Sequence, residues 1–383
     1  MKKRLSILGS TGSIGVSALD IFRGNQDRLE LFGLSAYSNI ELLTNQVEQY
    51  CPKFVTVCEK SAYDKFKTNF NSNTTKLLDY ETGIKTLATD PDVDIVLNAI
   101  VGAAGLEASV ETVKAGKRLA LANKESMVIG GELINEYAQK YNAEIIPVDS
   151  EHSAIWQSLA GGQKNEVRKI LLTGSGGPFR KMPIKDFESI TKEQALNHPT
   201  WNMGAKITID SATMMNKGLE VIEAVRLFDV SVEKIQVVIH PESIVHSMVE
   251  YIDSSIIAQM SNPDMRLPIS YALFYPERVF LESAKINLAT AGKLTFFEPD
   301  FEKFRLLKLA LDVAKKGGSC AAVMNAANEI AVEALLNDAI KFAKIPDIVI
   351  DSVEKYKNIE KPSLEEILEA DRWGREKAKE LAG

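Results

Sequence analysis

The first 150 residues alternate short apolar runs with amphipathic stretches, and this alternation limits the fold more than any other feature of the sequence. Intervening helical patterns include residues 40–50, which Asn39 can cap, and a helix that begins at Gly105. Strands that alternate with helices predict a parallel sheet with helices on both faces, a doubly wound α/β arrangement. The predicted strands, all apolar enough for burial on both faces, are residues 4–8, 31–36, 54–57, 95–98, 118–121 and 144–148.

The pattern changes after residue 150. Segments rich in Gly, Ser, His and Pro precede a predicted strand at 235–239 and a predicted hairpin with strands at 248–251 and 256–260, which indicate an antiparallel or mixed sheet. Residues 281–299 show little periodicity and predict a surface connector. The C-terminal part predicts a small helical bundle. Its helices are expected at 301–315, 321–336, 348–356 and 364–381, with breaks at Gly317-Gly318, Pro346 and Pro362.

Length and charge exclude several classes of protein. At about 100–200 residues per domain, 383 residues predict two or three domains. A formal net charge of −7 provides no general field for nucleic acid, so an anionic ligand has to be held by a local cluster of donors. The three cysteines lack metal-ligand spacing, and no apolar run approaches the roughly 18 residues of a membrane span. We therefore expect a cytoplasmic protein that binds neither nucleic acid nor a membrane.

A glycine-rich turn follows the first predicted strand. Gly9, Gly12 and Gly15 have the spacing G-x-x-G-x-x-G at the start of a helix, and Thr11 and Ser13 add hydroxyl donors. Glycines let the backbone approach a pyrophosphate, while N–H groups at a helix N-terminus face the anion. The alternative is a tight strand-to-helix turn without a ligand. The place of this glycine-rich turn, after the first strand of an alternating α/β pattern, favours dinucleotide binding.

The end of the second strand indicates which dinucleotide is bound. NAD sites usually carry an acidic residue there for the ribose 2′-hydroxyl, but residues 35–39 read Ser-Ala-Tyr-Ser-Asn. No carboxylate in this run would repel a 2′-phosphate, so the sequence favours NADP. Residues 99–102 and 121–126 follow other strands of the same sheet, at the carboxyl ends where such folds bind ligands.

Two segments carry residues suited to a divalent cation. In an extended chain, Asp149 and Glu151 would project from one face, a spacing that suits a hard cation, although a polar strand end with a helix cap is the alternative. If residues 216–224 are helical, Asn216, Lys217 and Glu220 share a face. Lys217 and Glu220 could form a solvated ion pair. The apolar neighbours of this helix instead favour burial, where both charges need partners such as a metal and a phosphate.

Two further segments have features of ligand-binding loops. Ser175 lies among glycines after a strand, in a backbone pattern that can bind an anion. His198, Trp201 and Gly204 share a loop that either closes as a lid or is anchored to the core by the indole. We interpret His240 and His246 as buried structural histidines, and we assign the polar residues of 325–333 to bundle packing. No P-loop, zincin or nucleophile-elbow motif occurs in the sequence.

Together and in this order, these motifs closely resemble the 1-deoxy-D-xylulose 5-phosphate reductoisomerase family. The matching segments are residues 9–15, 121–126, 147–153, 173–180, 198–204, 210–223, 240–247 and 325–329. The resemblance implies a V-shaped homodimer of α/β class, with a Rossmann-like parallel sheet, an α+β catalytic domain whose mostly antiparallel sheet forms the dimer, and a C-terminal α-helical bundle. The implied regions are an NADPH domain at 1–149, a catalytic, metal- and substrate-binding and dimerisation domain at 150–280 with a flexible lid near 198–206, a connector at 281–300, and the bundle at 301–383.

The resemblance also implies roles for individual residues. Metal ligands would be Asp149, Glu151 and Glu220, binding Mg²⁺ or Mn²⁺ with Co²⁺ as an alternative, and Lys124 and His198 would join them as catalytic residues. The sugar phosphate would contact Ser150, Glu151, Ser175, His198, Trp201, Ser211, Asn216, Lys217 and Glu220. NADPH would be lined by Thr11, Gly12, Ser13, Ile14, Tyr37, Ser38, Asn39, Asn123, Lys124, Glu125 and Gly204. Many family members have glycine and a basic residue where this chain has Tyr37 and Ser38, so recognition of the 2′-phosphate departs from the family pattern.

The implied reaction is the rearrangement and reduction of 1-deoxy-D-xylulose 5-phosphate to 2-C-methyl-D-erythritol 4-phosphate, in non-mevalonate isoprenoid biosynthesis. A divalent metal on the substrate carbonyl and the neighbouring hydroxyl makes carbon–carbon cleavage and re-addition feasible. The resemblance favours a retro-aldol and aldol path followed by hydride transfer, with a concerted 1,2-shift as the alternative. Two other classes stay open: a metal-assisted sugar-phosphate dehydrogenase without rearrangement, and a non-catalytic NADP-sensing protein.

Overall fold

A computed structural model describes residues 2–199, 201 and 203–383 of the chain. The chain forms two compact units, which are described separately below. The first consists of Met1–Asn123, Ile134–Ser153 and Asp264–Glu282, and the second of Lys124–Leu133, Ala154–Pro263 and Ser283–Gly383. The boundaries of the regions expected from the sequence stay predictions. Among the described residues, none of the helices has the length and apolar character needed to cross a membrane.

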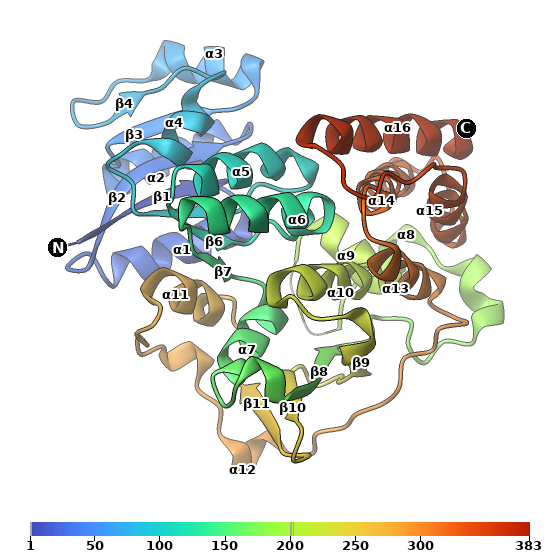
Figure 1. Cartoon of the computed structure of the whole chain (residues 1–383). Helices are drawn as coiled ribbons and strands as arrows, with labels where there is room; N and C mark the ends of the chain where they lie inside the picture. The colour runs from blue at the N-terminus through green and yellow to red at the C-terminus, as the bar shows by residue number, and fades with distance from the viewer. Residues whose placement is uncertain (1, 200, 202) are drawn as a thin grey trace. The chain divides into compact units, whose positions relative to one another are not determined.

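A seven-stranded, all-parallel sheet forms the centre of the first unit (Figure 1). The strand order is β4-β3-β2-β1-β5-β6-β7, so β1 lies between β2 and β5. The predicted parallel sheet is confirmed, and β4, only two residues long, is the strand that the sequence pattern did not reveal. The strands are β1 (Lys3–Leu8), β2 (Leu29–Ala36), β3 (Phe54–Val57), β4 (Lys76–Leu77), β5 (Ile95–Asn98), β6 (Arg118–Leu121) and β7 (Ile145–Pro147).

Helices connect these strands and cover the sheet. Because strand order runs outward in both directions from β1 and parallel crossovers are right-handed, helices on the two sides of β1 lie on opposite faces. Accordingly α1 packs with α11, and α4 packs with α5. Leu87 of α4 and Ala108 of α5 bury against Phe32 and Val96 of the sheet. The helices are α1 (Ser13–Arg23), α2 (Ile40–Tyr50), α3 (Lys60–Asn69), α4 (Gly83–Thr89), α5 (Leu106–Lys114) and α11 (Arg266–Phe274).

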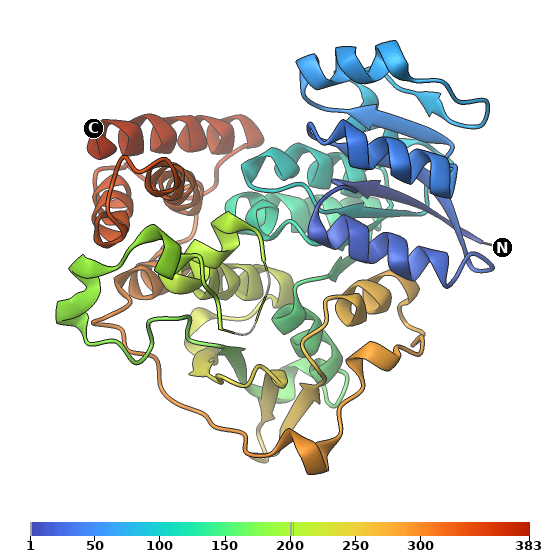
Figure 2. The same ribbon diagram turned by 180° about the vertical axis from the view of Figure 1, so that it is seen from behind.

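The second unit contains a four-stranded mixed sheet, seen from two sides in Figures 1 and 2. Its order is β11-β10-β8-β9, with β10 antiparallel to both neighbours and β8 parallel to β9. The predicted mostly antiparallel sheet and its hairpin are therefore confirmed. The strands are β8 (Val167–Gly174), β9 (Ile235–Ile239), β10 (Val245–Tyr251) and β11 (Ile256–Met260).

Helices make up the rest of the second unit. Helix α10 packs on α13 at Gly218, where an added Cβ would lie 2.6 Å from Ala310 Cβ, so the glycine allows close approach. Helix α14 packs on α15 and α16, which confirms the C-terminal helical bundle. The helices are α8 (Lys192–Ala195), α9 (Ala205–Ala212), α10 (Met215–Phe228), α12 (Leu288–Ala291), α13 (Arg305–Lys316), α14 (Cys320–Leu336), α15 (Ile345–Glu354) and α16 (Leu364–Ala382). Helices α6 (Lys124–Tyr141) and α7 (Ser150–Leu159) each contribute residues to both units.

Two predicted helix limits in the bundle are wrong. Pro346 does not break a helix but occupies the first turn of α15, a position where a missing N–H costs no hydrogen bond. Helix α13 begins at Arg305 rather than at residue 301, because the Asp300 side chain accepts a hydrogen bond from Lys303 N and holds this segment in a turn.

Candidate functional site

The glycine-rich turn of the first unit has a backbone that only glycine fits. Gly9 has a φ of +86°, and a Cβ there would lie 2.6 Å from the Ala99 carbonyl oxygen. At Gly15 a Cβ would lie 2.4 Å from Ser10 Cα. Gly12 precedes helix α1 and supplies no side-chain cap. N–H groups in the first turn of a helix lack intrahelical partners, so the N-terminus of α1 can receive an anion.

Gln46 of α2 holds this turn in place, a role that the sequence patterns did not indicate. Its amide Nε2 donates to the Ser10 carbonyl oxygen at 2.9 Å, and its Oε1 accepts from Ser10 Oγ at 2.7 Å. Both side chains are buried. One amide therefore satisfies two polar groups of Ser10, within the glycine-rich turn.

We expect the Gln46→Leu variant to destabilise the first unit. Leucine leaves the Ser10 hydroxyl and carbonyl groups buried without these partners, which costs about 1–3 kcal/mol. Chemical denaturation of the variant should show a lower midpoint than wild type. Gln26→Leu, an exposed position before β2, is the matched control and should leave the midpoint unchanged. Equal midpoints for Gln46→Leu and wild type would show that the turn does not depend on this amide.

The carboxyl end of β2 offers polar groups and no carboxylate. Tyr37 is 70% exposed, and Ser38 and Asn39 are also exposed. The side chain of Asn39 caps α2 by accepting from Leu42 N, as the sequence predicted. The nearby carboxylate of Glu59 is engaged at the start of α3, where it accepts hydrogen bonds from two backbone N–H groups.

Two buried asparagines shape the loop after β5. Asn98 donates to the Gly105 carbonyl oxygen and to Ser109 Oγ, both at 2.8 Å. Asn123 donates to the carbonyl oxygens of Ile100 and Gly102 at 2.7 and 2.8 Å. The side-chain amide of Asn123, which the resemblance assigns to NADPH, thus holds the loop beside the glycine-rich turn.

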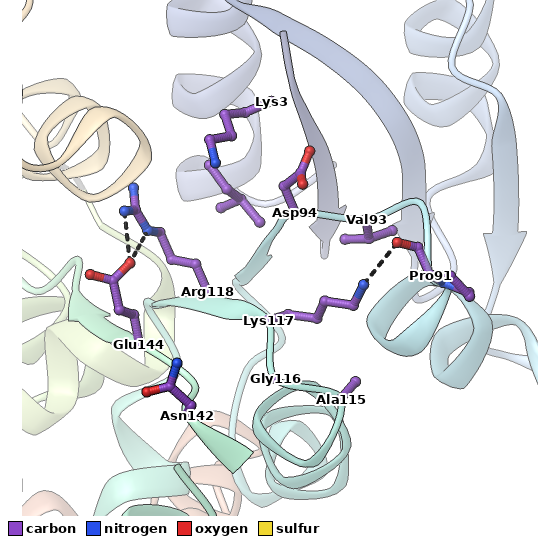
Figure 3. A pocket seen from close by; sticks show the side chains of 11 residues that line it. Lys3, Pro91, Val93, Asp94, Ala115, Gly116, Lys117, Arg118, Asn142 and Glu144 are labelled. Carbon is purple, nitrogen blue, oxygen red and sulfur yellow. Dashed lines mark hydrogen bonds and ion pairs between the residues drawn. The ribbon is translucent and has the colours of Figure 1, made fainter. Parts of the chain in front are cut away.

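A cavity of about 320 Å³ lies at the amino ends of the strands in the first unit (Figure 3). Two of the basic side chains that line it bond within the cavity: Arg118 pairs with Glu144 at 2.7 Å, and Lys117 Nζ donates to the Pro91 carbonyl oxygen at 3.1 Å. Ligands of doubly wound sheets bind at the opposite, carboxyl ends. We therefore assign no functional role to this cavity.

The predicted acidic segment follows β7, but its conformation differs from the prediction. Asp149 and Glu151 were expected in extended chain, whereas helix α7 begins at Ser150 and Glu151 lies in its first turn. Asp149 Oδ1 accepts a hydrogen bond from Glu151 N at 3.3 Å and thereby caps the helix. Ser150 Oγ donates to Glu151 Oε2, and buried His152 has Nδ1 3.6 Å from Asp149 Oδ1. The three polar residues at 149–151 are all partly exposed.

The second unit contains a buried carboxylate held by two ammonium groups. Glu220 of α10 is 1% exposed. Its Oε1 accepts from Lys124 Nζ at 3.2 Å and from the Asn216 amide, and its Oε2 accepts from Lys217 Nζ. Lys124 also donates to Asn216 Oδ1 at 2.8 Å. The predicted shared face of α10 is confirmed, and the predicted burial of Lys217 and Glu220 replaces the alternative of a solvated pair.

The backbone before α10 has an uncommon conformation. Met214 has a φ of +61°, which costs energy for a residue other than glycine. Its side chain is buried with the apolar residues of α10, and this packing offsets the cost. The turn at Met214 starts α10 so that Asn216, Lys217 and Glu220 occupy the first turns.

The glycine-rich turn after β8 lies against the same segment. A Cβ at Gly174 would lie 2.6 Å from Lys217 Cε, and one at Gly177 would lie 2.5 Å from the Ser211 carbonyl oxygen. Gly177 has a φ of +68°, and its N–H donates to Ser175 Oγ at 3.3 Å. The fold therefore brings Ser175 close to the segment with Ser211 and Lys217, as expected for an anion site.

The loop with His198 and Trp201 is tied to that turn. Residues 200 and 202 of the predicted lid lie outside the described part of the chain. Trp201 N donates to His198 Nδ1 at 3.0 Å, so a neutral ring carries its proton on Nε2, which lies 3.1 Å from Ser175 Oγ. Burial lowers the pKa of His198, which favours this neutral form. The loop ends at Gly204, an exposed residue that precedes α9.

His246 of β10 lies behind this loop, with its ring 6.5 Å from that of Trp201. Burial lowers the pKa of His246 to about 4, and Nε2 lies 2.9 Å from Ser261 Oγ. The prediction of a buried histidine at 246 agrees with an exposed fraction of 5%, and His240 is 0% exposed.

The depressed pKa of His246 predicts an acid-sensitive second unit. Because the folded pKa lies below the ordinary 6.5, the unfolded chain binds more protons between these values, and stability falls as the pH falls. Between pH 7 and pH 5 the free energy of unfolding should fall by about 2 kcal/mol, because each pH unit between the two pKa values contributes about 1.36 kcal/mol. Urea denaturation of His246→Gln should show a weaker pH dependence than wild type. Identical pH slopes would mean that other groups set the acid sensitivity.

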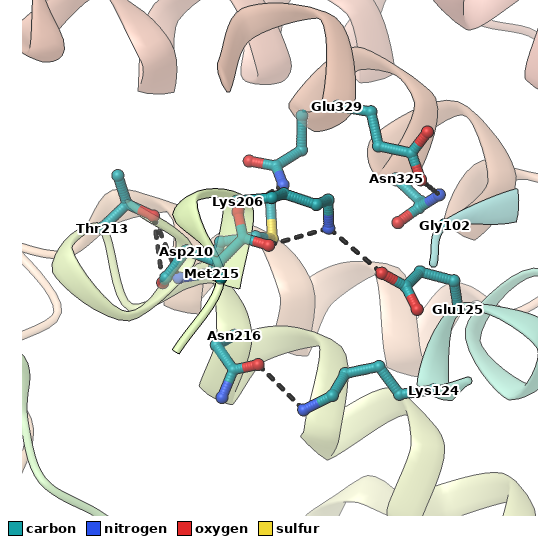
Figure 4. A network of polar contacts seen from close by, with 12 residues as sticks. Gly102, Lys124, Glu125, Lys206, Asp210, Thr213, Met215, Asn216, Asn325 and Glu329 are labelled. Atoms are coloured by element: carbon teal, nitrogen blue, oxygen red, sulfur yellow. Dashed lines mark hydrogen bonds and ion pairs between the residues drawn. The ribbon is translucent and has the colours of Figure 1, made fainter. Parts of the chain in front are cut away.

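A second charged network was not expected from the sequence (Figure 4). Lys206 Nζ lies 2.8 Å from Asp210 Oδ2 and 3.2 Å from Glu125 Oε1. Asn328 of α14 donates to Asp210 Oδ1 at 2.7 Å. The assignment of the polar residues of 325–333 to bundle packing is correct for Glu329, which pairs with Arg375 of α16, and wrong for Asn328, which bonds to α9. In the sequence, the (i, i+4) spacing of Lys206 and Asp210 is the signal that could have indicated their ion pair.

Three family models match the chain over most of its length. Residues 5–131 match the model described as 1-deoxy-D-xylulose 5-phosphate reductoisomerase, and residues 145–228 match the C-terminal domain model of the same enzyme. Residues 260–377 match a further DXP reductoisomerase C-terminal domain model. The chain belongs to the 1-deoxy-D-xylulose 5-phosphate reductoisomerase family. The resemblance stated from the sequence motifs is thus confirmed.

Relatives and solved structures agree with this membership. The chain is 49% identical to 1-deoxy-D-xylulose 5-phosphate reductoisomerase of Chlorobium limicola, with both proteins covered completely. It is 48% identical to that of Chlorobaculum tepidum, again over the whole of both. A solved structure of the Zymomonas mobilis enzyme in complex with NADPH has 38% identity and a TM-score of 0.93, covering 100% of this chain and 99% of the other. A DOX-P reductoisomerase in complex with NADPH, fosmidomycin and magnesium has 40% identity and a TM-score of 0.94, covering 99% and 98%. The family is one of NADPH-dependent oxidoreductases, so the chain is an enzyme of this class.

Proposed function

We propose that this chain converts 1-deoxy-D-xylulose 5-phosphate to 2-C-methyl-D-erythritol 4-phosphate, with NADPH as reductant and Mg²⁺ or Mn²⁺ as the metal. The observation that carries this proposal is the buried Glu220 carboxylate with Lys124, Asn216 and Lys217 around it. Two ammonium groups and a carboxylate are costly to bury together, and a site that binds a metal and a phosphate accounts for such a buried charged cluster. Family membership and the complexes described for the similar structures supply the reaction and the cofactors.

We assign the metal to Asp149, Glu151 and Glu220, the ligands that the family resemblance implies. Three carboxylates are an all-oxygen donor set, which hard divalent cations prefer. A bound cation of this kind would polarise the substrate carbonyl and acidify its neighbouring hydroxyl.

We assign the phosphate of the substrate to the second unit. Ser175 and Ser211 offer hydroxyl donors, Asn216 an amide, and Lys217 a positive charge. The close packing of Gly174 on Lys217 and of Gly177 on Ser211 supports this grouping. Binding energy from this remote phosphate can orient the reacting carbons. Ser150 and Lys124 would contact the sugar, and His198 and Trp201 would close over it and exclude water.

We assign NADPH to the carboxyl edge of the parallel sheet. The Gly9–Gly15 turn would bind the pyrophosphate, because its backbone is open to an anion at the start of α1. Tyr37, Ser38 and Asn39 would surround the 2′-phosphate, and the absence of a carboxylate from residues 35–39 supports NADP over NAD. The remaining assigned cofactor residues are Thr11, Ser13, Ile14, Asn123, Lys124, Glu125 and Gly204.

We further propose that the reaction serves non-mevalonate isoprenoid biosynthesis in the cytoplasm, and that the chain has the regional division expected from the sequence. The catalytic region would be residues 150–280 with a lid near 198–206. The NADPH region at 1–149, the connector at 281–300 and the bundle at 301–383 would complete the chain. Support comes from the family and from the confirmed fold class.

The decisive experiment is NADPH oxidation with 1-deoxy-D-xylulose 5-phosphate, with and without Mg²⁺ or Mn²⁺. We expect a fall in absorbance at the NADPH band only when both substrate and metal are present. Product analysis should give the branched 2-C-methyl skeleton. A straight-chain product would instead indicate a dehydrogenase without rearrangement, and no metal-dependent oxidation would defeat the proposal.

We also propose that the chain is a homodimer joined through the four-stranded sheet. Strand β11 is at the end of the strand order, and Ile256 and Ile257 on it are 53% and 36% exposed. An exposed apolar edge strand is a template for pairing with another chain. Ile252, in the turn between β10 and β11, is 67% exposed and adds to this apolar surface.

Replacement of Ile256 by lysine should weaken this dimer, because charged side chains on an edge strand oppose pairing. Sedimentation velocity of wild type should give the mass of two chains, and the variant should dissociate at concentrations at least about tenfold higher. Leu288→Lys, at another exposed apolar position, is the control. A monomeric wild type at micromolar concentration would contradict the proposal.

A further inference from the structure

Lys206 occupies a position between two acidic side chains from different parts of the chain (Figure 4). It lies in the first turn of α9, with a side chain 20% exposed. One carboxylate, that of Asp210, is four residues along the same helix, and the other, that of Glu125, lies in the first turn of α6. The ammonium group thus links α9 to the start of α6.

Asp210 fixes the other end of this link. It is 2% exposed, and its two oxygens have different partners, Lys206 Nζ for one and the Asn328 amide of α14 for the other. With a hydrogen bond to each oxygen, the Asp210 carboxylate is restrained in orientation. Lys206 is therefore held from the α9 side by a carboxylate that cannot turn away without losing a buried hydrogen bond.

The same segment leads directly to the proposed substrate residues. The Asp210 carbonyl oxygen accepts from Thr213 Oγ1 at 3.2 Å, and Thr213 Oγ1 accepts from Met215 N at 3.3 Å, at the start of α10. From α10, Asn216 accepts a hydrogen bond from Lys124. The start of α6 is thus attached to the α9–α10 segment at two adjacent residues, through Lys124 and through Glu125.

The electrostatics agree with a permanent charge on Lys206. Burial lowers its pKa, but the carboxylates of Asp210, Glu125 and Glu329 outweigh this effect and raise the pKa above its ordinary value. Glu329 is itself paired with Arg375 of α16 at 2.6 Å. Removal of the Lys206 charge would take away the ammonium group that Glu125 and Asp210 share.

We propose that Lys206 is a positioning residue that acts through Glu125: it fixes the first turn of α6, and with it the Lys124 ammonium, against the α9–α10 segment. Within the described residues its hydrogen bonds go to Asp210 and Glu125; Glu125 is assigned to NADPH, and neither residue is assigned to the metal or the sugar phosphate. The expected consequence is an effect on turnover through alignment. This inference rests on the proposed function for its kinetic part, but the local ordering of α6 can be measured without it.

The kinetic test is a double-mutant cycle with Lys206→Met and Glu125→Gln. A misplacement of a catalytic group by about 1 Å can lower the reaction rate about 100-fold, so Lys206→Met should lower kcat by about 10- to 100-fold. The KM for the sugar phosphate should change by less than about threefold, since the assigned phosphate residues are untouched. The double variant should be no slower than the slower single variant, because both changes break one link. Lys206→Arg, which keeps the charge, should recover most of the activity.

Hydrogen–deuterium exchange gives a readout independent of activity. Exchange in residues 124–133 should be faster in Lys206→Met and in Glu125→Gln than in wild type. Lys355→Met is the matched control, because Lys355 forms an exposed (i, i+4) pair with Asp351 on α15. It should change neither kcat nor exchange at α6.

The outcomes separate the two hypotheses. Wild-type kcat in Lys206→Met, or losses in the double variant that multiply, would overturn the positioning role. Unchanged exchange at residues 124–133 would overturn it even if the enzyme proved inactive. Absence of activity in wild type would defeat only the proposed function, and faster exchange in the variants would still support the role of Lys206.

Discussion

Glutamine in place of Glu220 is expected to abolish turnover, chiefly by weakening metal binding. The substitution keeps the shape of the side chain but removes the charge, and it aims an amide NH₂ group at the Lys124 or Lys217 ammonium. Removing a residue that only hydrogen-bonds to a metal ligand lowers metal affinity or activity by about 10- to 100-fold. Removing an assigned ligand itself should therefore lower kcat by more than about 100-fold. Titration with Mn²⁺, followed by its paramagnetic signal, should show a weaker dissociation constant in the variant.

The chain contains a matched control for this experiment. On α16, Lys377 and Glu380 form an ion pair with the same (i, i+3) order as Lys217 and Glu220, but Glu380 is 69% exposed. Exposed pairs contribute little, so Glu380→Gln should leave both kcat and Mn²⁺ affinity at wild-type values. A Glu220→Gln variant with wild-type rate and metal affinity would remove Glu220 from the site.

The order of strands and helices follows from local pattern, which explains why the fold class was predictable. The predicted strands at residues 54–57, 95–98 and 118–121 have the same limits as β3, β5 and β6, because nearly every residue of these short strands is buried and the mainly apolar run coincides with the strand. The two-residue β4 gave no comparable signal. A strand this short is defined by its pairing with β3, a non-local contact that periodicity cannot reveal.

The helix starts show where local pattern becomes ambiguous. Asp149 and Glu151 fit both an extended spacing and a helix N-terminus, and the cap geometry of Asp149 decided for the helix. Pro346 was also misinterpreted: it was predicted to break a helix, but it lies in the first turn of α15. In both cases one residue type has two structural uses, and tertiary context selects between them.

The candidate site was predictable where its residues are close in sequence. Asn216, Lys217 and Glu220 share one helix face, so their grouping followed from helical spacing. The bonds of Lys206 to Glu125 and of Asn328 to Asp210 were missed because each joins residues far apart in the chain. Gln46 and Ser10 illustrate the same limit in the first unit, because their buried hydrogen bond joins residues 36 positions apart in the sequence.

Alanine in place of Lys217 is expected to raise the KM for the phosphorylated sugar. A charge-assisted hydrogen bond contributes about 1.5–3 kcal/mol, which corresponds to an increase of about 10- to 100-fold. Glu220 keeps Lys124 and Asn216 as partners in the variant, so the fold should survive, which circular dichroism can check. The KM for NADPH should stay at its wild-type value, because Lys217 is not among the residues assigned to the cofactor.

The phosphate dependence can be isolated by comparing two substrates. Wild type should prefer 1-deoxy-D-xylulose 5-phosphate strongly over 1-deoxy-D-xylulose, and Lys217→Ala should lose much of this preference because its deficit arises at the phosphate. Lys377→Ala on α16, which removes the first residue of the matched exposed pair, should keep the full preference. If Lys217→Ala lowered kcat/KM equally for both sugars, the lysine would serve the Glu220 carboxylate alone, and the phosphate would have to be bound by Ser175, Ser211 and Asn216 without it.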